Sequence, residues 1–166
     1  MSLCNSSSRR RFFTPRGGGS FGTTYSVVLG GNTFLNRVDV AGGVVFREAP
    51  DHGRRPLVGV IAHERVHALL ERRYGALACS RMPTWKIEGY CEYVGGGTTI
   101  DAEEGKRLVR ERRRDESGPA RYFRHFIMVK YLLDVEGLDV DAVMAREFDE
   151  AEVLERVQGS LNRLRP

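Results

Sequence analysis

The chain lacks the features that mark membrane proteins and disulfide-rich secreted domains. No apolar run in its 166 residues approaches the roughly eighteen residues that a membrane-spanning helix needs. The N-terminus has no apolar segment of the secretory type, and an odd set of three cysteines (Cys4, Cys79 and Cys91) predicts reduced thiols. We therefore expect no membrane segment and, for the chain as written, a cytoplasmic location. Export or anchoring through a segment further upstream stays open.

Lysine is scarce as well, with three residues against twenty-three arginines, and the net charge is +4. Two basic runs, Arg9–Arg11 and Arg110–Arg114, could meet the phosphates of a nucleic acid. The second run is diluted by neighbouring carboxylates at Glu103, Glu104, Glu111, Asp115 and Glu116, and no nucleic-acid-binding motif is present. A solvated helix face is the favoured interpretation, and nucleic-acid binding is the rival one.

Two of only four histidines fall in one pentapeptide, His63-Glu64-Arg65-Val66-His67. Residues four apart share one face of a helix, so both imidazoles can reach a single metal ion. Glu64, beside the first histidine, can then reach a water bound to that ion, which is why this spacing indicates a zinc hydrolase site. The alternative is a pair of core histidines satisfied by backbone carbonyls.

A helix that carries this pentapeptide is predicted over about nineteen residues, Pro56–Tyr74. Proline is tolerated in the first turn, and Gly75 suits the left-handed cap at the other end. Apolar residues surround nearly the whole helix, which predicts that it is buried. Polar groups at the centre of a buried helix need partners, and a metal ion would supply one.

A third ligand is expected from a second helix, Trp85–Val94, with Thr84 as its N-cap. Glu88 and Glu92 are four residues apart and project from one face. We expect Glu88 to bind the metal and Glu92 to accept a hydrogen bond from the ring N–H of a ligating histidine. A solvated pair of carboxylates is the alternative. Cys91 is expected to be a small core residue and a poor zinc ligand.

These motifs resemble the gluzincin metallopeptidases, most closely the small peptidase-MA-like branch. His63-Glu64-x-x-His67 is followed, after twenty intervening residues, by Glu88 in the context Met82-Pro83-Thr84-Trp85-Lys86-Ile87-Glu88-Gly89-Tyr90. The matching positions lie between His63 and Leu133, which is under half of the chain. The resemblance implies an α+β, zincin-like fold in which a small N-terminal sheet packs on the motif helix and a helical C-terminal part follows. It also implies that the edge strand before this helix, Ala41–Arg47 here, holds the substrate.

A single Zn²⁺ ion held by His63, His67 and Glu88 would lower the pKa of a bound water from about 15.7 to about 7. Glu64 would then act as the general base in the hydrolysis of a peptide bond. The family often adds a tyrosine that stabilises the oxyanion, and Tyr122 is the preferred candidate. His125 and Tyr131 are the others, and a core aromatic is the alternative role.

The remaining organisation follows from turn and cap residues. Residues 1–20 are expected to be disordered, and residues 21–166 to form a single domain. Glycine turns separate predicted strands at Tyr25–Leu29, Thr33–Val40 and Val44–Phe46. Four C-terminal helices are predicted: a basic one that begins at Thr98 and Asp101 and runs to about Arg114, one over about Ala120–Val135, a short piece near Val143 that Asp139 and Asp141 can cap, and one from Asp149 to about Arg163.

The sequence thus predicts a zinc peptidase that acts on a peptide or protein substrate. A catalytically inactive, zinc-stabilised module is an alternative, although Glu64 and all three expected ligands are present. The substrate-binding residues, the cleavage specificity and the oligomeric state are left open by the sequence.

Overall fold

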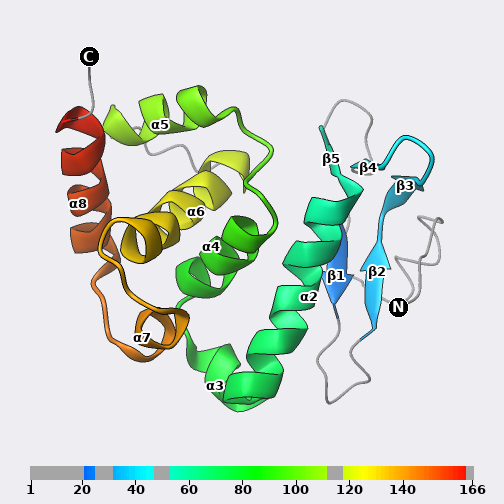
Figure 1. The fold of residues 1–166 in the computed structure, drawn as a ribbon, viewed down its shortest axis with the longest axis horizontal. Coiled ribbons are helices and arrows are strands. Elements are labelled where there is room, and N and C mark those ends of the chain that lie inside the picture. Colours follow the sequence, from blue (N-terminus) through cyan, green and yellow to red (C-terminus); the bar gives the residue numbers. More distant parts are fainter. Residues whose placement is uncertain (1–20, 25–31, 47–52, 112–117, 164–166) are drawn as a thin grey trace. The chain divides into compact units, whose positions relative to one another are not determined.

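The computed structural model describes residues 21–24, 32–46, 53–111 and 118–163, and their elements make the α+β fold that the sequence predicted (Figure 1). The chain divides into two compact units, residues 1–81 and 82–166. The expected single domain over residues 21–166 stays a prediction. The disorder expected for residues 1–20 and the strand expected at Tyr25–Leu29 lie outside the described residues.

The first unit carries all the strands of the described residues, in two antiparallel sheets. In the smaller sheet, β1 (Gly22–Thr24) pairs with β2 (Thr33–Leu35). The larger sheet has the order β3-β4-β5, formed by Arg37–Asp39, Val44–Phe46 and Arg54–Pro56. The stretch expected as one partly alternating segment, Thr33–Val40, is therefore two strands that belong to different sheets.

The expectation that Ala41–Arg47 forms an edge strand is wrong. Within it, β4 pairs with β3 on one side and with β5 on the other, so it is the central strand of its sheet. β5 has the sequence Arg-Arg-Pro, which shows no alternation of apolar and polar residues, although Arg55 is buried and both of its neighbours are exposed. Over the described residues, the strand at the edge of this sheet that precedes the motif helix is β5.

The motif helix α2 (Leu57–Tyr74) follows β5 without a loop. Pro56 is its N-cap, and Gly75 ends it with φ 86° while its N–H donates to the Glu71 carbonyl, so both predicted boundaries hold within one residue. The helix is not buried all round, because Val58 and Leu69 are 78% and 55% exposed. A short helix, α3 (Ala76–Arg81), ends the unit.

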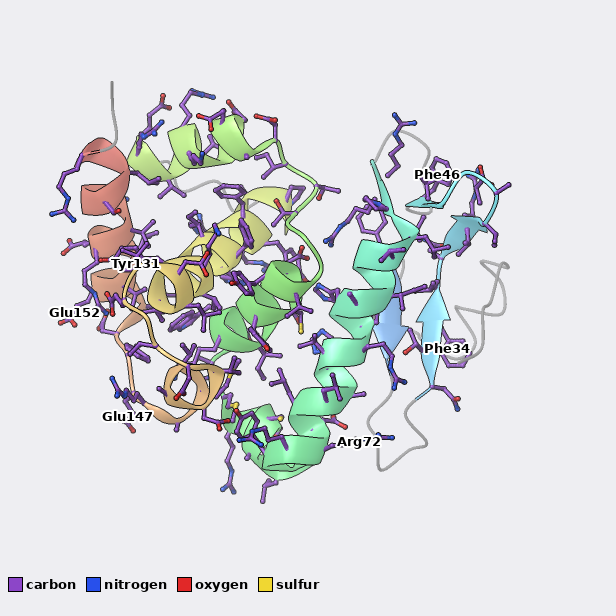
Figure 2. All side chains as sticks on the ribbon, in the orientation of Figure 1. Phe34, Phe46, Arg72, Tyr131, Glu147 and Glu152 are labelled. Carbon is purple, nitrogen blue, oxygen red and sulfur yellow. The ribbon has the colours of Figure 1, made fainter. Side chains whose placement is uncertain are left out.

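The core of the first unit lies where the strands meet α2. Leu35 and Val45 from the sheets pack with Phe21 and with Val60 from the first turn of the helix, and all four are buried. Figure 1 shows β1 and β2 running along α2, and Figure 2 shows Phe34 and Phe46 on β2 and β4. This packing fixes the N-terminal part of α2, and hence the start of the motif.

The second unit is helical over the described residues. Its helices are α4 (Thr84–Val94), α5 (Ala102–Arg110), α6 (Gly118–Asp134), α7 (Val140–Ala145) and α8 (Glu150–Arg163). The expected caps Asp101, Asp139 and Asp149 all accept hydrogen bonds from backbone N–H groups of the helices that follow them. Thr84 is not the N-cap of α4. The helix begins at Thr84, one residue before the predicted start at Trp85, and Pro83 is its N-cap.

Helix α6 is the centre of the second unit, since it packs against each of the other four helices. Its buried residues join those of α4, α5, α7 and α8 in one core: Trp85, Val109, Phe123, Ile127, Met128, Val129, Leu132, Val143, Val153, Val157 and Leu161. Two glycines permit the closest approaches, because a Cβ on Gly89 would overlap the His125 carbonyl and one on Gly105 would overlap the Phe123 ring. The predicted helical C-terminal part is therefore confirmed as a packed unit.

Candidate metal centre

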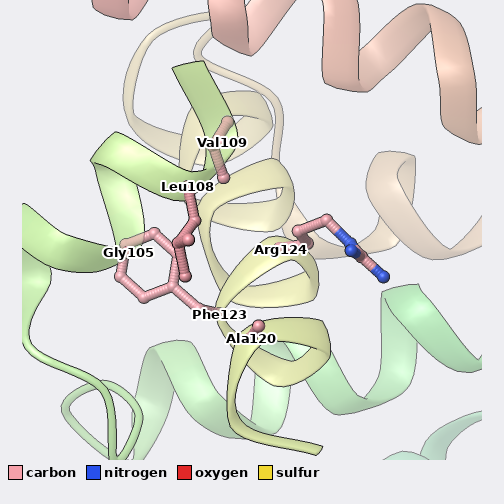
Figure 3. A pocket seen from close by; sticks show the side chains of 6 residues that line it. All are labelled: Gly105, Leu108, Val109, Ala120, Phe123 and Arg124. Atoms are coloured by element: carbon pink, nitrogen blue, oxygen red, sulfur yellow. The ribbon is translucent and has the colours of Figure 1, made fainter. Parts of the chain in front are cut away.

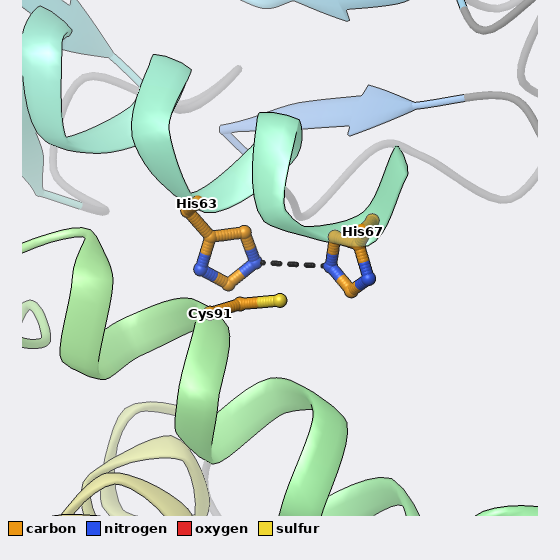
Figure 4. A group of neighbouring side chains, drawn as sticks. All are labelled: His63, His67 and Cys91. Atoms are coloured by element: carbon orange, nitrogen blue, oxygen red, sulfur yellow. Dashed lines mark hydrogen bonds between the residues drawn. The ribbon is translucent and has the colours of Figure 1, made fainter. Parts of the chain in front are cut away.

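The two motif histidines meet on one face of α2. Their Nε2 atoms are 3.3 Å apart, and their ring centroids are separated by 5.1 Å at an interplanar angle of 64°. His63 is buried and His67 half-buried. Figure 4 shows both rings below the same helix with this contact dashed. The four-residue spacing, read from the sequence, therefore brings two potential ligand nitrogens together.

The nitrogen separation fits a shared metal ion. Two nitrogens bound at roughly 2.0–2.1 Å to one tetrahedral zinc ion lie about 3.3 Å apart, the separation that His63 and His67 show. The same distance also allows an N–H···N hydrogen bond between two neutral imidazoles. Which of the two occurs depends on whether metal is bound, and metal analysis separates them.

Glu64 is buried in the middle of α2, next to His63 along the chain. An ionised carboxylate is rarely buried in the middle of a helix unless its charge is met by another group. The local sequence places it there because Val60, Val66, Ala68 and Leu70 bury the same part of the helix.

The residues expected to complete the site lie on α4, in the second unit. Glu92 and Cys91 are buried, and Glu88 is half-buried. The predicted helix α4 is thus confirmed, and so is the expectation that Cys91 is a small buried residue. His63, His67 and Cys91 each offer an atom of a type that binds transition metals. On α4, both the Cys91 thiol and the Glu88 carboxylate are therefore of a type that can bind a metal ion.

The three candidates for a group that assists the reaction lie on α6 in different surroundings. Tyr131 packs against the hydrophobic core of the second unit (Figure 2). Tyr122 is half-buried and meets the ring of His125 edge to face, with centroids 6.2 Å apart. His125 is buried. Tyr131 therefore lies against the core, whereas Tyr122 and His125 form a separate pair of rings.

His125 is held in its neutral form. Burial lowers the pKa of its imidazole to about 4; Glu88 opposes this shift, and the guanidinium groups of Arg121 and Arg124 add to it. At neutral pH the ring has one N–H donor and one acceptor nitrogen. The sequence had named His125 as a candidate from its position on the predicted helix, but only the structure shows that it is buried and near Glu88.

The second unit also has a small apolar cleft between α5 and α6, shown in Figure 3. It is lined by Gly105, Leu108, Val109, Ala120, Phe123 and Arg124, and it has room for about one water molecule. A cleft of this size accepts no peptide side chain, so it has no part in the candidate site.

Two basic residues of α5, Lys106 and Arg107, form ion pairs with nearby carboxylates. Arg107 forms ion pairs with Glu104 at 2.7 Å and with Glu111 at 3.0 Å, and Lys106 pairs with Glu103 at 2.6 Å. Of the run Arg110–Arg114 itself the structure describes only Arg110 and Glu111, so the interpretation of a solvated helix face stays a prediction. Arg112–Arg114 lie outside the described residues.

Over the described residues, no helix combines the length and the apolar character needed to cross a membrane. The chain matches no protein-family model, no curated protein and no solved structure at a significant level. The resemblance to gluzincins is therefore carried by this chain's own residues and spacing.

Proposed function

We propose that this protein is a zinc-dependent peptidase of the gluzincin type with a zincin-like arrangement of its sheet and motif helix. The observation that supports it most directly is the 3.3 Å separation of the His63 and His67 Nε2 atoms. It suits a shared ion, and Glu64 lies between them on the same helix. The proposed ligands are His63, His67 and Glu88, with Glu92 as partner of a ligating histidine.

Zinc, when bound, would supply Lewis acidity and make a bound water acidic. Glu64 would take the proton of the attacking water and return it to the leaving amine. Tyr122 or His125 would donate a hydrogen bond to the oxygen of the peptide carbonyl as negative charge develops there. Tyr131 is less suited, because it packs against the core. The substrate would be a peptide or a protein, and one zinc ion per chain is expected.

The central test combines metal analysis with digestion of a peptide library by the full chain. The wild-type protein should hold equimolar zinc and cleave peptides, whereas His63→Ala should lose the metal. Glu64→Gln should keep zinc and the fold but lose hydrolysis by several orders of magnitude, since it removes the base. Glu71→Gln, on the same helix two turns further on, is the matched control and should cleave normally.

Two results would overturn the proposal. Unchanged cleavage by Glu64→Gln would show that Glu64 is not the base. Zinc binding without cleavage of any peptide by the wild-type chain would favour the zinc-stabilised, inactive module instead.

The third ligand can be assigned separately with cobalt in place of zinc. A thiolate ligand gives a charge-transfer band in the near ultraviolet that carboxylate ligands lack. With Glu88 as ligand, Cys91→Ala should leave the cobalt spectrum and the metal affinity unchanged, and Glu88→Ala should weaken binding strongly. The opposite pattern would assign the role to Cys91.

A further inference from the structure

The backbones of α4 and α6 touch at the residue that follows the proposed ligand. A Cβ built on Gly89 would overlap the carbonyl oxygen of His125, and it would also meet the side chain of Val129. Any other residue at position 89 would hold the two helices further apart. Gly89 therefore brings His125 of α6 next to the turn of α4 that carries Glu88.

The His125 side chain is enclosed at this contact. It is 7% exposed, and its Nδ1 atom has no hydrogen-bond partner among the described residues. A buried polar atom without a partner is destabilising, so such an atom in a folded protein calls for an explanation, such as a functional role. The Tyr122 ring covers one side of the imidazole and offers an aromatic edge contact.

We propose that His125 is a positioning residue for Glu88, whose carboxylate it holds by a hydrogen bond from a ring N–H when zinc is bound. This inference rests on the proposed function, in which Glu88 is a zinc ligand. A carboxylate has two oxygens, so one can bind the metal while the other accepts from the imidazole. Ligating carboxylates are commonly fixed by such hydrogen bonds, and their loss weakens metal binding by 10- to 100-fold.

The charges around His125 agree with this role. Among the described residues, Glu88 is the carboxylate whose charge acts on the pKa of His125, and burial keeps the ring neutral. A neutral ring can donate one hydrogen bond to Glu88 without cancelling the negative charge that the metal requires. Arg121 and Arg124 also act on His125 from the same helix and disfavour its protonation.

The test measures zinc affinity of the full chain by competition with a chromophoric chelator. His125→Leu should weaken zinc binding by about 10- to 100-fold. The amide N–H groups of Asn and Gln stand near the positions of Nδ1 and Nε2, so His125→Asn or His125→Gln should restore most of the affinity. Leu132→Ala, which removes a fully buried side chain two turns along the same helix, is the control and should leave zinc affinity within a few-fold.

A double-mutant cycle with Glu88→Ala separates positioning from general destabilisation. If His125 acts through Glu88, then His125→Leu should weaken zinc binding little further once Glu88→Ala is present. Equal zinc affinity of His125→Leu and wild type, or a full additional loss in the double variant, would overturn the inference. Unchanged zinc affinity of Glu88→Ala alone would instead refute the ligand set of the proposed function.

A second measurement covers the case in which His125→Leu does not fold. Long-range ¹H–¹⁵N NMR of the zinc-loaded wild type should show one His125 ring N–H in a hydrogen bond. Its proton resonance should move upfield in Glu88→Ala loaded with the same metal. A resonance that does not respond to Glu88→Ala would contradict the proposed hydrogen bond.

Discussion

Single residues of the second unit set how closely its helices approach. Gly89 and Gly105 lie inside helices, where glycine is roughly 1 kcal/mol less favourable than alanine. The structure explains both, because the carbonyl of His125 and the ring of Phe123 occupy the space of a side chain. At position 89 this close contact also places His125 beside Glu88, so a packing residue serves the candidate site.

Replacing Gly89 tests this contact. Gly89→Ala should lower the free energy of unfolding by about 1–3 kcal/mol, because the added methyl group forces α4 and α6 apart. Gly159→Ala is the matched control: this glycine lies on α8 with open space around its Cβ position, and alanine should raise stability by about 0.5–1 kcal/mol. Urea denaturation of the two variants measures both values. A stabilising Gly89→Ala would show that the helices are not in contact there.

Helices are the next scale, and in the second unit aspartates at their N-termini define where they start. Asp101, Asp139 and Asp149 each accept from backbone N–H groups of the first turn, which would otherwise be without partners. These starts were predictable because the capping interaction is local. The start of α4 was harder to predict, because its N-cap, Pro83, makes no side-chain hydrogen bond to the helix.

The cap of α8 gives a prediction at this scale. Asp149 accepts from the N–H groups of Ala151 and Glu152 at 2.8 and 3.1 Å. Asp149→Ala should cost about 1 kcal/mol of stability, and Asp149→Ser should recover most of it. Glu155→Ala, at an exposed position of the same helix, should change stability by less than about 0.5 kcal/mol. Thermal or urea unfolding measures the difference, and equal effects of the two alanine variants would refute the cap.

The end of α6 is tied to α4 by a group that titrates. Hydrogen bonds from Lys130 and from the Tyr93 hydroxyl lower the pKa of Asp134. Because the folded-state pKa is depressed, the stabilisation is present above the unfolded pKa of about 3.9 and is lost as the pH falls through the folded value. The group is largely exposed, so solvent screening limits the effect to under about 1 kcal/mol.

Asp134→Asn should therefore be less stable than wild type at pH 7 by a few tenths of a kcal/mol. The two proteins should become equally stable well below the pKa of Asp134, where the wild-type carboxyl is also uncharged. Urea denaturation at a series of pH values measures this, and added salt should shrink the difference. A difference that persists at low pH would point to packing rather than charge.

At the scale of the whole molecule, the proposed metal ligands come from two helices, α2 and α4. Zinc bound by His63, His67 and Glu88 would therefore stabilise α2 and α4 together. At a free zinc concentration 100-fold above the dissociation constant, binding to the folded state adds about 2.7 kcal/mol. Metal removal should make both helices easier to open.

Hydrogen exchange measured with and without a chelator tests this. Zinc should slow amide exchange in peptides from both α2 and α4, and the effect should vanish in His63→Ala. Protection confined to α2 would show that the third ligand does not come from α4. If the protection of α4 disappears in Cys91→Ala but persists in Glu88→Ala, the Cys91 thiol is the third metal ligand.

The sequence predicted the parts of the fold that depend on local periodicity and capping. The span of α2, the starts of α5, α7 and α8, and the 3.3 Å approach of two imidazoles all follow from spacing along one helix. It failed on β4, which was expected at an edge and lies at the centre of its sheet. Strand order depends on pairing between distant segments, and the partner strand β5 has a charged, proline-ending sequence without a strand pattern.

The sequence by itself determined the chemistry available to this protein: His63, Glu64 and His67 on one helix and two carboxylates on another, because helix geometry fixes which residues share a face. Only the tertiary structure decided which residues surround them. The contact at Gly89, the burial of His125 beside Glu88 and the core position of Tyr131 come from the packing of α6 against its neighbours. Such packing joins residues far apart in the chain, and no local pattern encodes it.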